Sequence, residues 1–257
     1  MTKIGIIGGS AVGNLLNNPD KIYINTPYGE MSSPVEIGKI GGKEVAVLYR
    51  HGRPHKIPPH KINYRANIYG LKEIGVERII SLSAVGSLQS HIQPGTIVFP
   101  DQFFDNTKGR IYTFYDGPQV VHISVADPFC PEMTDIFHRS SLELGFKSIN
   151  GGTYVCIEGP RFSTRSESKF FKTVGDIIGM TLVPEINLAK EKEMCYLTVA
   201  TVTDYDVWAE IPVSSKEVTK VMKENEENII SLLNKTIPKI PEERSCSCKN
   251  SLKEAGL

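Results

Sequence analysis

The chain has 257 residues, and its 29 Lys and Arg residues balance its 29 Asp and Glu residues. This zero net charge argues against a nucleic-acid or anionic-membrane partner. A hydrophobic content of 40% and a charged content of 23% are typical of a soluble globular domain with a large core. No segment approaches the ~20 apolar residues of a membrane span, and the N-terminal residues do not resemble a signal peptide, so we expect a cytoplasmic protein.

Short apolar runs alternate along the chain with amphipathic segments, which is the pattern of an α/β sheet. Buried strands are predicted within residues 3–9, 44–49, 77–88, 151–158, 176–181 and 195–204. Helices are predicted at 61–75, after Ser163 as N-cap, from Pro184 as first helical residue, and at 214–233. Residues 97–132 are rich in aromatic and β-branched residues and predict further, more twisted or antiparallel strands. We expect one domain, residues 1–240, followed by a polar, extended tail, residues 241–257.

The five cysteines raise the question of a disulfide or a metal site. They are Cys130, Cys156, Cys195, Cys246 and Cys248. Only the last two are close in sequence, and their C-x-C spacing is tight for a zinc knuckle, so the sequence predicts no metal site. Reduced thiols are expected in a mesophile's cytosol, whereas in a hyperthermophile the C-x-C pair could form a strained, exchange-prone disulfide. The sequence leaves the pairing open.

Several predicted strands end in polar or small residues, and the carboxyl ends of strands are where open α/β sheets bind ligands. The first strand breaks into glycines before Ser10. This turn lacks the spacing of a dinucleotide fold or a P-loop, but its hydroxyl and N–H groups can hold an anion. Six strand ends together predict one convergent pocket. They carry Ser10, Arg50 with His51, Ser83, Phe162 with Ser163, Met180 with Thr181, and Asp204 with Asp206.

Three histidines, His51, His55 and His60, follow Arg50 in a proline-rich stretch. A metal site is less favoured than anion recognition here, because prolines interrupt the spacing and no carboxylate joins the histidines. A guanidinium group offers a planar fork to phosphate or carboxylate. A surface salt bridge is the alternative for Arg50.

The strand at 195–204 leads into two carboxylates, Asp204 and Asp206. An isolated Asp-x-Asp would indicate a solvated loop or a helix cap. Because five other strand ends supply anion-binding or ring-stacking groups, the two carboxylates become the candidates for catalysis and ligand recognition.

Motifs along nearly the whole chain resemble the purine nucleoside phosphorylase family, in its archaeal methylthioadenosine-cleaving branch with a C-terminal C-x-C. The matching stretches, in the family's order, are IGIIGGS, TPYG, RHGRPH, NYRANI, SAVGSLQ, QPG, DQFFD, FYDG, ADPFCP, IEGPRFSTRSE, MTLVPEINLAKE and TVTDYDVW. The resemblance implies one α/β domain on a mixed, twisted, partly barrel-like sheet flanked by helices, assembled as a trimer or hexamer. It also implies reversible phosphorolysis, in which 5'-methylthioadenosine and phosphate give adenine and 5-methylthioribose 1-phosphate. Phosphate is then a co-substrate, and no cofactor or metal is implied.

The resemblance also assigns roles to individual residues. Phosphate would be held by Ser10, Arg50, His51, Ser83, Ala84 and Thr181, with Ser10 where the family more often has Thr. Met180 would pack on the ribose, Phe162 and Ser163 would form the purine wall, and Asp204 and Asp206 would recognise the base. His122 would reach a neighbouring subunit's 5'-pocket, Val218 would contact the alkylthio group, and Ser163 and Ser215 would bear on specificity. Gly179 stands where Asn is common.

The implied chemistry agrees with these residue types. Cleavage of the N-glycosidic bond develops negative charge on the purine, which a proton at N7 relieves. Asp204 can supply it if its pKa is raised, and Asp204 or Asp206 can accept from the N6 amine, which leaves that assignment open. A 6-oxopurine would be mismatched there at a cost of roughly 1–3 kcal/mol, or about one to two decades in rate.

Three alternatives remain. The first is a broad-specificity purine nucleoside phosphorylase acting on adenosine, inosine or guanosine. The second is a hydrolytic nucleosidase, against which Arg50 and His51 argue, and the third is a nucleoside-binding relative without catalysis.

Overall fold

The computed structural model describes residues 4–9, 15–209, 215–253 and 255–256. Its strands are β1 (Ile4–Gly8), β2 (Asp20–Ile22), β3 (Val35–Ile40), β4 (Lys43–Tyr49), β5 (Arg78–Ser87), β6 (Ile97–Phe99), β7 (Gln102–Asn106), β8 (Ser148–Asn150), β9 (Thr153–Ile157), β10 (Ile177–Gly179) and β11 (Cys195–Asp204). Its helices are α1 (Tyr64–Glu73), α2 (Pro131–Glu143), α3 (Arg165–Val174), α4 (Glu185–Glu191) and α5 (Ser215–Thr236). Short 3-10 helices are η2 (Pro59–Lys61), η3 (Asp206–Trp208), η4 (Ile237–Lys239) and η5 (Ser247–Asn250).

All these strands belong to one mixed sheet, in which β5 is the branch point. The first half of β5 pairs in parallel with β1, its end pairs antiparallel with β10, and its whole length pairs in parallel with β11 on the other side. From β10 the sheet continues through β9 to β7, and from β11 it continues through β6 to β8. This branching curls the sheet and confirms the predicted single, mixed, partly closed α/β architecture.

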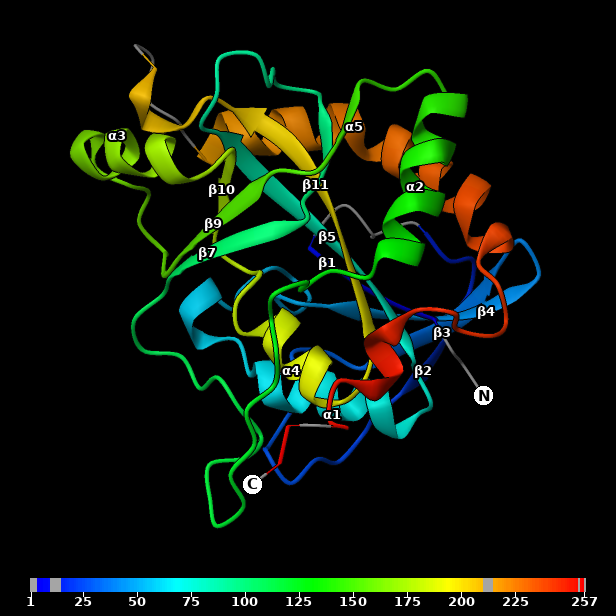
Figure 1. Ribbon diagram of the computed structural model, residues 1–257. Helices are drawn as coiled ribbons and strands as arrows, with labels where there is room; N and C mark the ends of the chain where they lie inside the picture. The colour runs from blue at the N-terminus through cyan, green and yellow to red at the C-terminus, as the bar shows by residue number, and fades with distance from the viewer. Residues whose placement is uncertain (1–3, 10–14, 210–214, 254, 257) are drawn as a thin grey trace.

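Strand β11 runs through the centre of the molecule between two helical layers (Figure 1). Helices α1 and α4 lie on one side, and α2 and α5 on the other. Alternate side chains of β11 enter the two cores: Cys195, Leu197 and Val199 pack with the α2 and α5 residues. Tyr196, Ala200 and Val202 pack with those of α1 and α4. The period-2 alternation of a strand between two cores therefore explains why almost every residue of β11 is buried.

The prediction of strands beyond residue 106 in the middle section was wrong. Between β7 and α2 the structure has only an isolated bridge, Val121 to Gly256. A buried carboxylate takes the place of a neighbouring strand here. Glu191 accepts hydrogen bonds from the Thr113 hydroxyl and the Phe114 N–H, at 2.6 and 2.7 Å. Backbone polar groups satisfied by a side chain do not need a sheet partner.

Two predicted helix starts need correction. Thr164, not Ser163, is the N-cap of α3, because Thr164 forms a reciprocal capping box with Glu167. Pro184 is the N-cap of α4 rather than its first residue.

The segment after residue 240 was expected to be extended, yet it contains η5 and buries Cys246 in the core beside α2 and α5. Within the described part of the chain, no helix is long and apolar enough to cross a membrane.

Candidate active site

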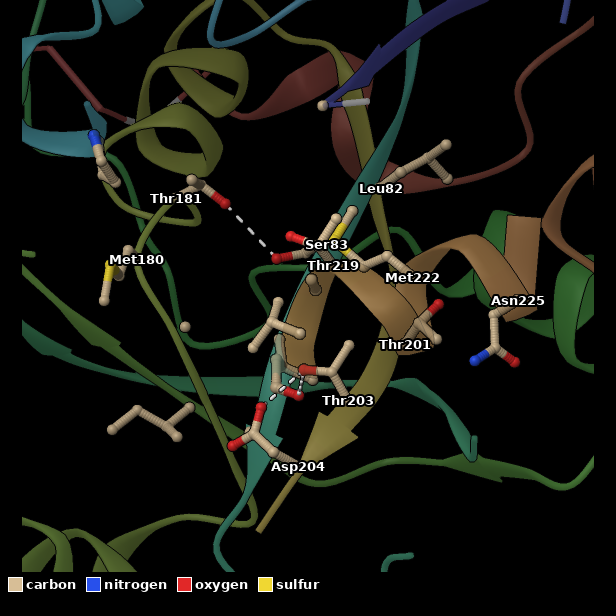
Figure 2. A pocket seen from close by; sticks show the side chains of 18 of the residues that line it. Leu82, Ser83, Met180, Thr181, Thr201, Thr203, Asp204, Thr219, Met222 and Asn225 are labelled. Carbon is tan, nitrogen blue, oxygen red and sulfur yellow. Dashed lines mark hydrogen bonds between the residues drawn. The ribbon is translucent and has the colours of Figure 1, made fainter. Parts of the chain in front are cut away.

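A cavity of about 730 Å³ opens at the carboxyl ends of β4, β5, β10 and β11, and the part of α5 from Val218 to Ile229 lines it as well. Figure 2 shows Met180 and Thr181 on one side of it, Ser83 from β5 and Thr219 from α5 near the middle, and Met222 and Asn225 from α5 on the opposite side. The cavity gathers ten of the predicted site residues. They are Arg50, His51, Ser83, Ala84, Phe162, Met180, Thr181, Asp204, Asp206 and Val218.

One end of the cavity carries hydroxyl groups. Ser83 Oγ lies 3.5 Å from the Thr181 hydroxyl and 3.0 Å from the Tyr154 hydroxyl. Tyr154 can sit there because the adjoining strand has glycine at position 179. A Cβ on Gly179 would lie 2.0 Å from the Tyr154 hydroxyl oxygen. Gly179 thus leaves room for a tyrosine that orients Ser83.

Arg50 reaches the same end from β4 and is held rigidly. Its side chain is 1% exposed and forms a fork to Glu185, with Nε and Nη2 each 2.7 Å from a carboxylate oxygen. Nη2 also donates to the Ser81 hydroxyl, and Nη1 donates to the carbonyl of Leu82. Burial alone would lower the pKa of Arg50, but the charge and hydrogen bonds of Glu185 more than offset it and raise that pKa. The guanidinium is therefore a fixed positive charge beside the cavity.

His51 lines the cavity next to Arg50 as a neutral ring. Its Nδ1 donates to the carbonyl of Ile57 at 2.9 Å, since a carbonyl oxygen can only accept. Burial, followed by the charge of Arg50, lowers the pKa of His51 to about 4. Nδ1 then carries the only proton, and Nε2 is an acceptor. His55 stacks on this ring with the centroids 4.1 Å apart.

The opposite end of the cavity carries the carboxylates of Asp204 and Asp206. Here β11 loses register with β5, between Val202 and Asp204. Asp204 Oδ1 accepts from the Asp206 N–H at 2.8 Å, and Oδ2 lies 2.7 Å from the Thr203 hydroxyl (Figure 2). A Cβ on Gly86 of β5 would lie only 2.9 Å from Asp204 Oδ1, so a glycine in β5 allows this close approach.

Asp206 is more deeply placed than Asp204, at 4% exposed, and adopts a left-handed backbone with φ of +50°. Its Oδ2 accepts from the Ser168 hydroxyl of α3 at 2.5 Å. Burial raises the pKa of Asp206, and the Ser168 hydrogen bond offsets part of that rise. Left-handed backbone at a non-glycine residue costs about 1–3 kcal/mol and is concentrated at functional sites.

Two of the predicted residues within the described ranges, Ser163 and His122, do not line this cavity. Ser163 lines a smaller pocket with Arg161 and Glu167, and within the described residues its hydroxyl has no hydrogen-bond partner. His122 is exposed, with its backbone N–H bonded to Ala255. Ser10 and the side chain of Ser215 lie outside the described residues.

Sequence reasoning missed Glu185, Tyr154 and Thr203. Glu185 and Thr203 lie within the matching stretches MTLVPEINLAKE and TVTDYDVW, but no role was assigned to them. A carboxylate directly after Pro184 and a hydroxyl directly before Asp204 were visible signals of buried polar partners. His51, His55 and His60 form no metal-binding group in the described ranges.

Comparison with known proteins places these features in a family. The model of the phosphorylase superfamily matches residues 3–238. A protein from Pyrococcus abyssi named S-methyl-5'-thioadenosine phosphorylase is 60% identical over 253 residues, covering 98% of each chain. A protein of the same name from Nitrosopumilus maritimus is 51% identical, covering 98% of this chain and 97% of its own.

Solved structures agree. A methylthioadenosine phosphorylase from an Antarctic soil metagenomic library superposes with a TM-score of 0.94 at 40% identity, covering 100% of this chain and 92% of its own. Methylthioadenosine phosphorylase from Schistosoma mansoni in complex with adenine has a TM-score of 0.92 at 34% identity, covering 98% and 96%. The chain belongs to the phosphorylase superfamily.

Proposed function

We propose that the protein catalyses the reversible phosphorolysis of 5'-methylthioadenosine, giving adenine and 5-methylthioribose 1-phosphate. One observation carries the proposal: a single cavity has a fixed cation with hydroxyl groups at one end and two carboxylates at the other. Relatives that cover nearly the whole chain bear the name of this phosphorylase. Phosphate is the co-substrate, and the mechanism uses no cofactor.

Phosphate binds at the Arg50 end in this proposal. The Arg50 charge attracts the dianion, and the Ser83 and Thr181 hydroxyls, 3.5 Å apart, can each donate to one phosphate oxygen. Neutral His51 can accept a hydrogen bond at Nε2 from the hydroxyl group of a hydrogen phosphate dianion, which leaves the unprotonated phosphate oxygens free to face the sugar. The Ala84 and Gly9 backbone completes this wall, and Ser10 is proposed to add its hydroxyl.

The sugar and base then extend from phosphate toward the carboxylates. Met180 packs against the ribose, Phe162 covers the purine face, and Val218 and Met222 of α5 enclose the 5'-methylthio group. Bond cleavage leaves positive charge on the ribose next to phosphate and negative charge on the purine next to Asp204. In this proposed orientation, each developing charge lies beside a complementary group.

A proton on Asp204 fits the hydrogen bonds around Thr203. The Thr203 hydroxyl lies 2.7 Å from Asp204 Oδ2 and 3.2 Å from the Val85 carbonyl oxygen, but it has one proton. If Thr203 donates to Val85, the short contact to Asp204 is satisfied by a proton on the carboxyl group. When the purine binds, the Thr203 hydroxyl can turn from Val85 to donate to Asp204 Oδ2, which releases the carboxyl proton for transfer to purine N7. Asp204 then acts as the general acid, and Asp206 positions it through its backbone N–H.

The alternative is a broad phosphorylase that accepts inosine and guanosine as well as adenosine. A carboxylate that accepts from an N6 amine meets a second acceptor when the purine carries a 6-oxo group. The unmatched pair costs roughly 1–3 kcal/mol, which corresponds to about one to two decades in rate.

A substrate panel with and without phosphate tests the proposal. Release of adenine from methylthioadenosine should require phosphate and yield one 5-methylthioribose 1-phosphate per adenine. The value of kcat/KM for inosine should be about 10- to 100-fold lower. Preference for inosine would favour the broad phosphorylase, and release of adenine without phosphate would instead identify a hydrolase.

We also propose a cytoplasmic homo-oligomer, either trimer or hexamer. The proposal is supported by exposed apolar side chains, among them Phe162 before α3, Phe170 on α3 and Val120 in the loop before α2. His122 lies outside the cavity of its own subunit, which fits a role in a neighbour's 5'-pocket. Sedimentation of the native protein decides between the two sizes.

A further inference from the structure

Four of the five cysteines meet at the end of β11 that lies farthest from the cavity. Cys195 is the first residue of β11, Cys130 is the N-cap of α2, and Cys246 and Cys248 lie at η5. Figure 1 shows this arrangement: the red C-terminal segment lies against the start of the yellow β11. The sequence argument that only the C-x-C pair is close was therefore wrong in three dimensions.

The four sulfur atoms all lie within 4.8 Å of one another, and Cys195 Sγ is 3.3 Å from Cys246 Sγ. In a tetrahedral tetrathiolate with Zn–S bonds of about 2.3 Å, the sulfur atoms are about 3.8 Å apart. The cluster spans that value, so small side-chain rotations bring it to tetrahedral geometry. We propose that Cys130, Cys195, Cys246 and Cys248 bind one thiophilic divalent ion, of which Zn²⁺ is the best match.

The surroundings suit a closed, negatively charged site. Three of the thiols are buried and Cys248 is half-buried, and the four sulfur atoms leave no open coordination position. The Cys130 side chain makes no capping hydrogen bond, so its sulfur is available at the positive end of α2. The ammonium group of Lys190 lies close enough to Cys130 and Cys248 to interact electrostatically with both, so it would attract their thiolates. All four residues are free thiols in the structure.

Such an ion would be structural, because it joins three segments that are far apart in sequence. The C-terminal segment already docks through polar contacts on the same side: Arg244 donates to the Glu193 carbonyl, and Arg78 donates to the Glu243 carbonyl. A metal ion would add a bond that holds η5 to α2 and β11. The cluster lies roughly 30 Å from Asp204, at ~3.3 Å per residue along β11, so it takes no part in catalysis.

Metal analysis of protein purified without chelator, under anaerobic reducing conditions, tests the site. We expect about one zinc ion per chain. After zinc is replaced by Co²⁺, we expect the visible absorption of cobalt bound tetrahedrally by four thiolates. Cys248→Ser should weaken metal binding by more than about 10-fold, since even outer partners of metal ligands matter that much. Cys156→Ser is the matched control: Cys156 is buried but lies outside the cluster, and it should keep the metal.

Removing the metal should lower the thermal midpoint of the wild-type protein by about 10 °C, while kcat/KM at 25 °C changes by less than about twofold. If Cys248→Ser does not fold, maleimide labelling of the wild type replaces it: zinc should protect the four cluster thiols, and a chelator should expose them. Reduced protein that binds neither zinc nor cobalt would overturn the proposal. So would two disulfides joining the four cysteines in protein isolated anaerobically without reductant.

Discussion

The two ends of β11 differ in how regularly they pair with β5 and in what surrounds them. At the amino end, Cys195 is buried in a core with α2, α5 and the C-terminal segment, and the strand keeps register with β5. At the carboxyl end, the register with β5 shifts, and Asp204 and Asp206 line the cavity instead of continuing the regular pairing. The regularly paired amino end of β11 stabilises the fold, whereas the carboxyl end, where pairing is interrupted, carries the candidate active site.

The comparison predicts that substitutions at the carboxyl end change activity, whereas those at the amino end change stability alone. The largest effect should come from Asp204→Asn, which removes the proposed acid but keeps the shape. We expect kcat/KM for methylthioadenosine to fall by about 100- to 10,000-fold, the range of a general acid. Steady-state assays on methylthioadenosine and inosine measure it, and the loss on inosine should be much smaller.

Asp135→Asn is the control for that experiment, because Asp135 is an exposed carboxylate on α2. It should leave both substrates unaffected. Equal losses on methylthioadenosine and inosine in Asp204→Asn would contradict the assigned role, and a greater loss in Asp206→Asn would transfer that role to Asp206.

Beside the cavity, Glu185 should matter to both stability and activity. Glu185→Gln leaves the buried guanidinium of Arg50 without a charge partner, and breaking such a pair costs about 3–5 kcal/mol. We expect urea unfolding to show a loss of that size. We expect KM for phosphate to rise because the guanidinium loses the carboxylate fork that fixes its position at the phosphate end of the cavity. The exposed pair Arg139 and Asp135 is the comparison, since Asp135→Asn should cost less than about 1 kcal/mol. Similar losses in the two variants would show that burial does not strengthen the Arg50 pair.

The sequence predicted the strands that carry this site because each is a run of apolar, β-branched residues with polar groups at its end. Arg50, Thr181 and Asp204 could therefore be placed at one edge of the sheet. What escaped prediction depends on contacts between distant segments. Glu191 replaces a strand partner for Phe114, and Cys130 meets Cys246 through the packing of α2 and the C-terminal segment. Local periodicity contains no information about such pairs.

The low pKa of His51 should make stability depend on pH. The folded-state value is about 4, against about 6.5 in the unfolded chain. As pH falls from 6.5 to 4, the unfolded chain takes up the proton first, so stability is lost across this window and no further below it. The loss should be about 3 kcal/mol, at 1.36 kcal/mol for each of about 2.5 units.

Urea unfolding at pH 7 and pH 4 measures this loss, and His51→Asn should lose about 3 kcal/mol less than the wild type between these values. His91→Asn, which removes an exposed histidine, should behave like the wild type. If His51→Asn and the wild type lost stability equally, His51 would not be held neutral in the folded protein.

The smallest effect should separate the two candidate caps of α3, the helix whose Ser168 supports Asp206. Thr164→Ala removes a capping box and should cost about 1 kcal/mol in urea unfolding. Ser163→Ala should change stability by less than about 0.5 kcal/mol, because the Ser163 hydroxyl has no hydrogen bond in the described part of the chain. Ser168 lies on the same helix and donates to Asp206, so a weakened α3 should hold Asp206 less firmly. Thr164→Ala should therefore also lower kcat/KM slightly. Equal stability losses in both variants would mean that Ser163 contributes to the cap after all.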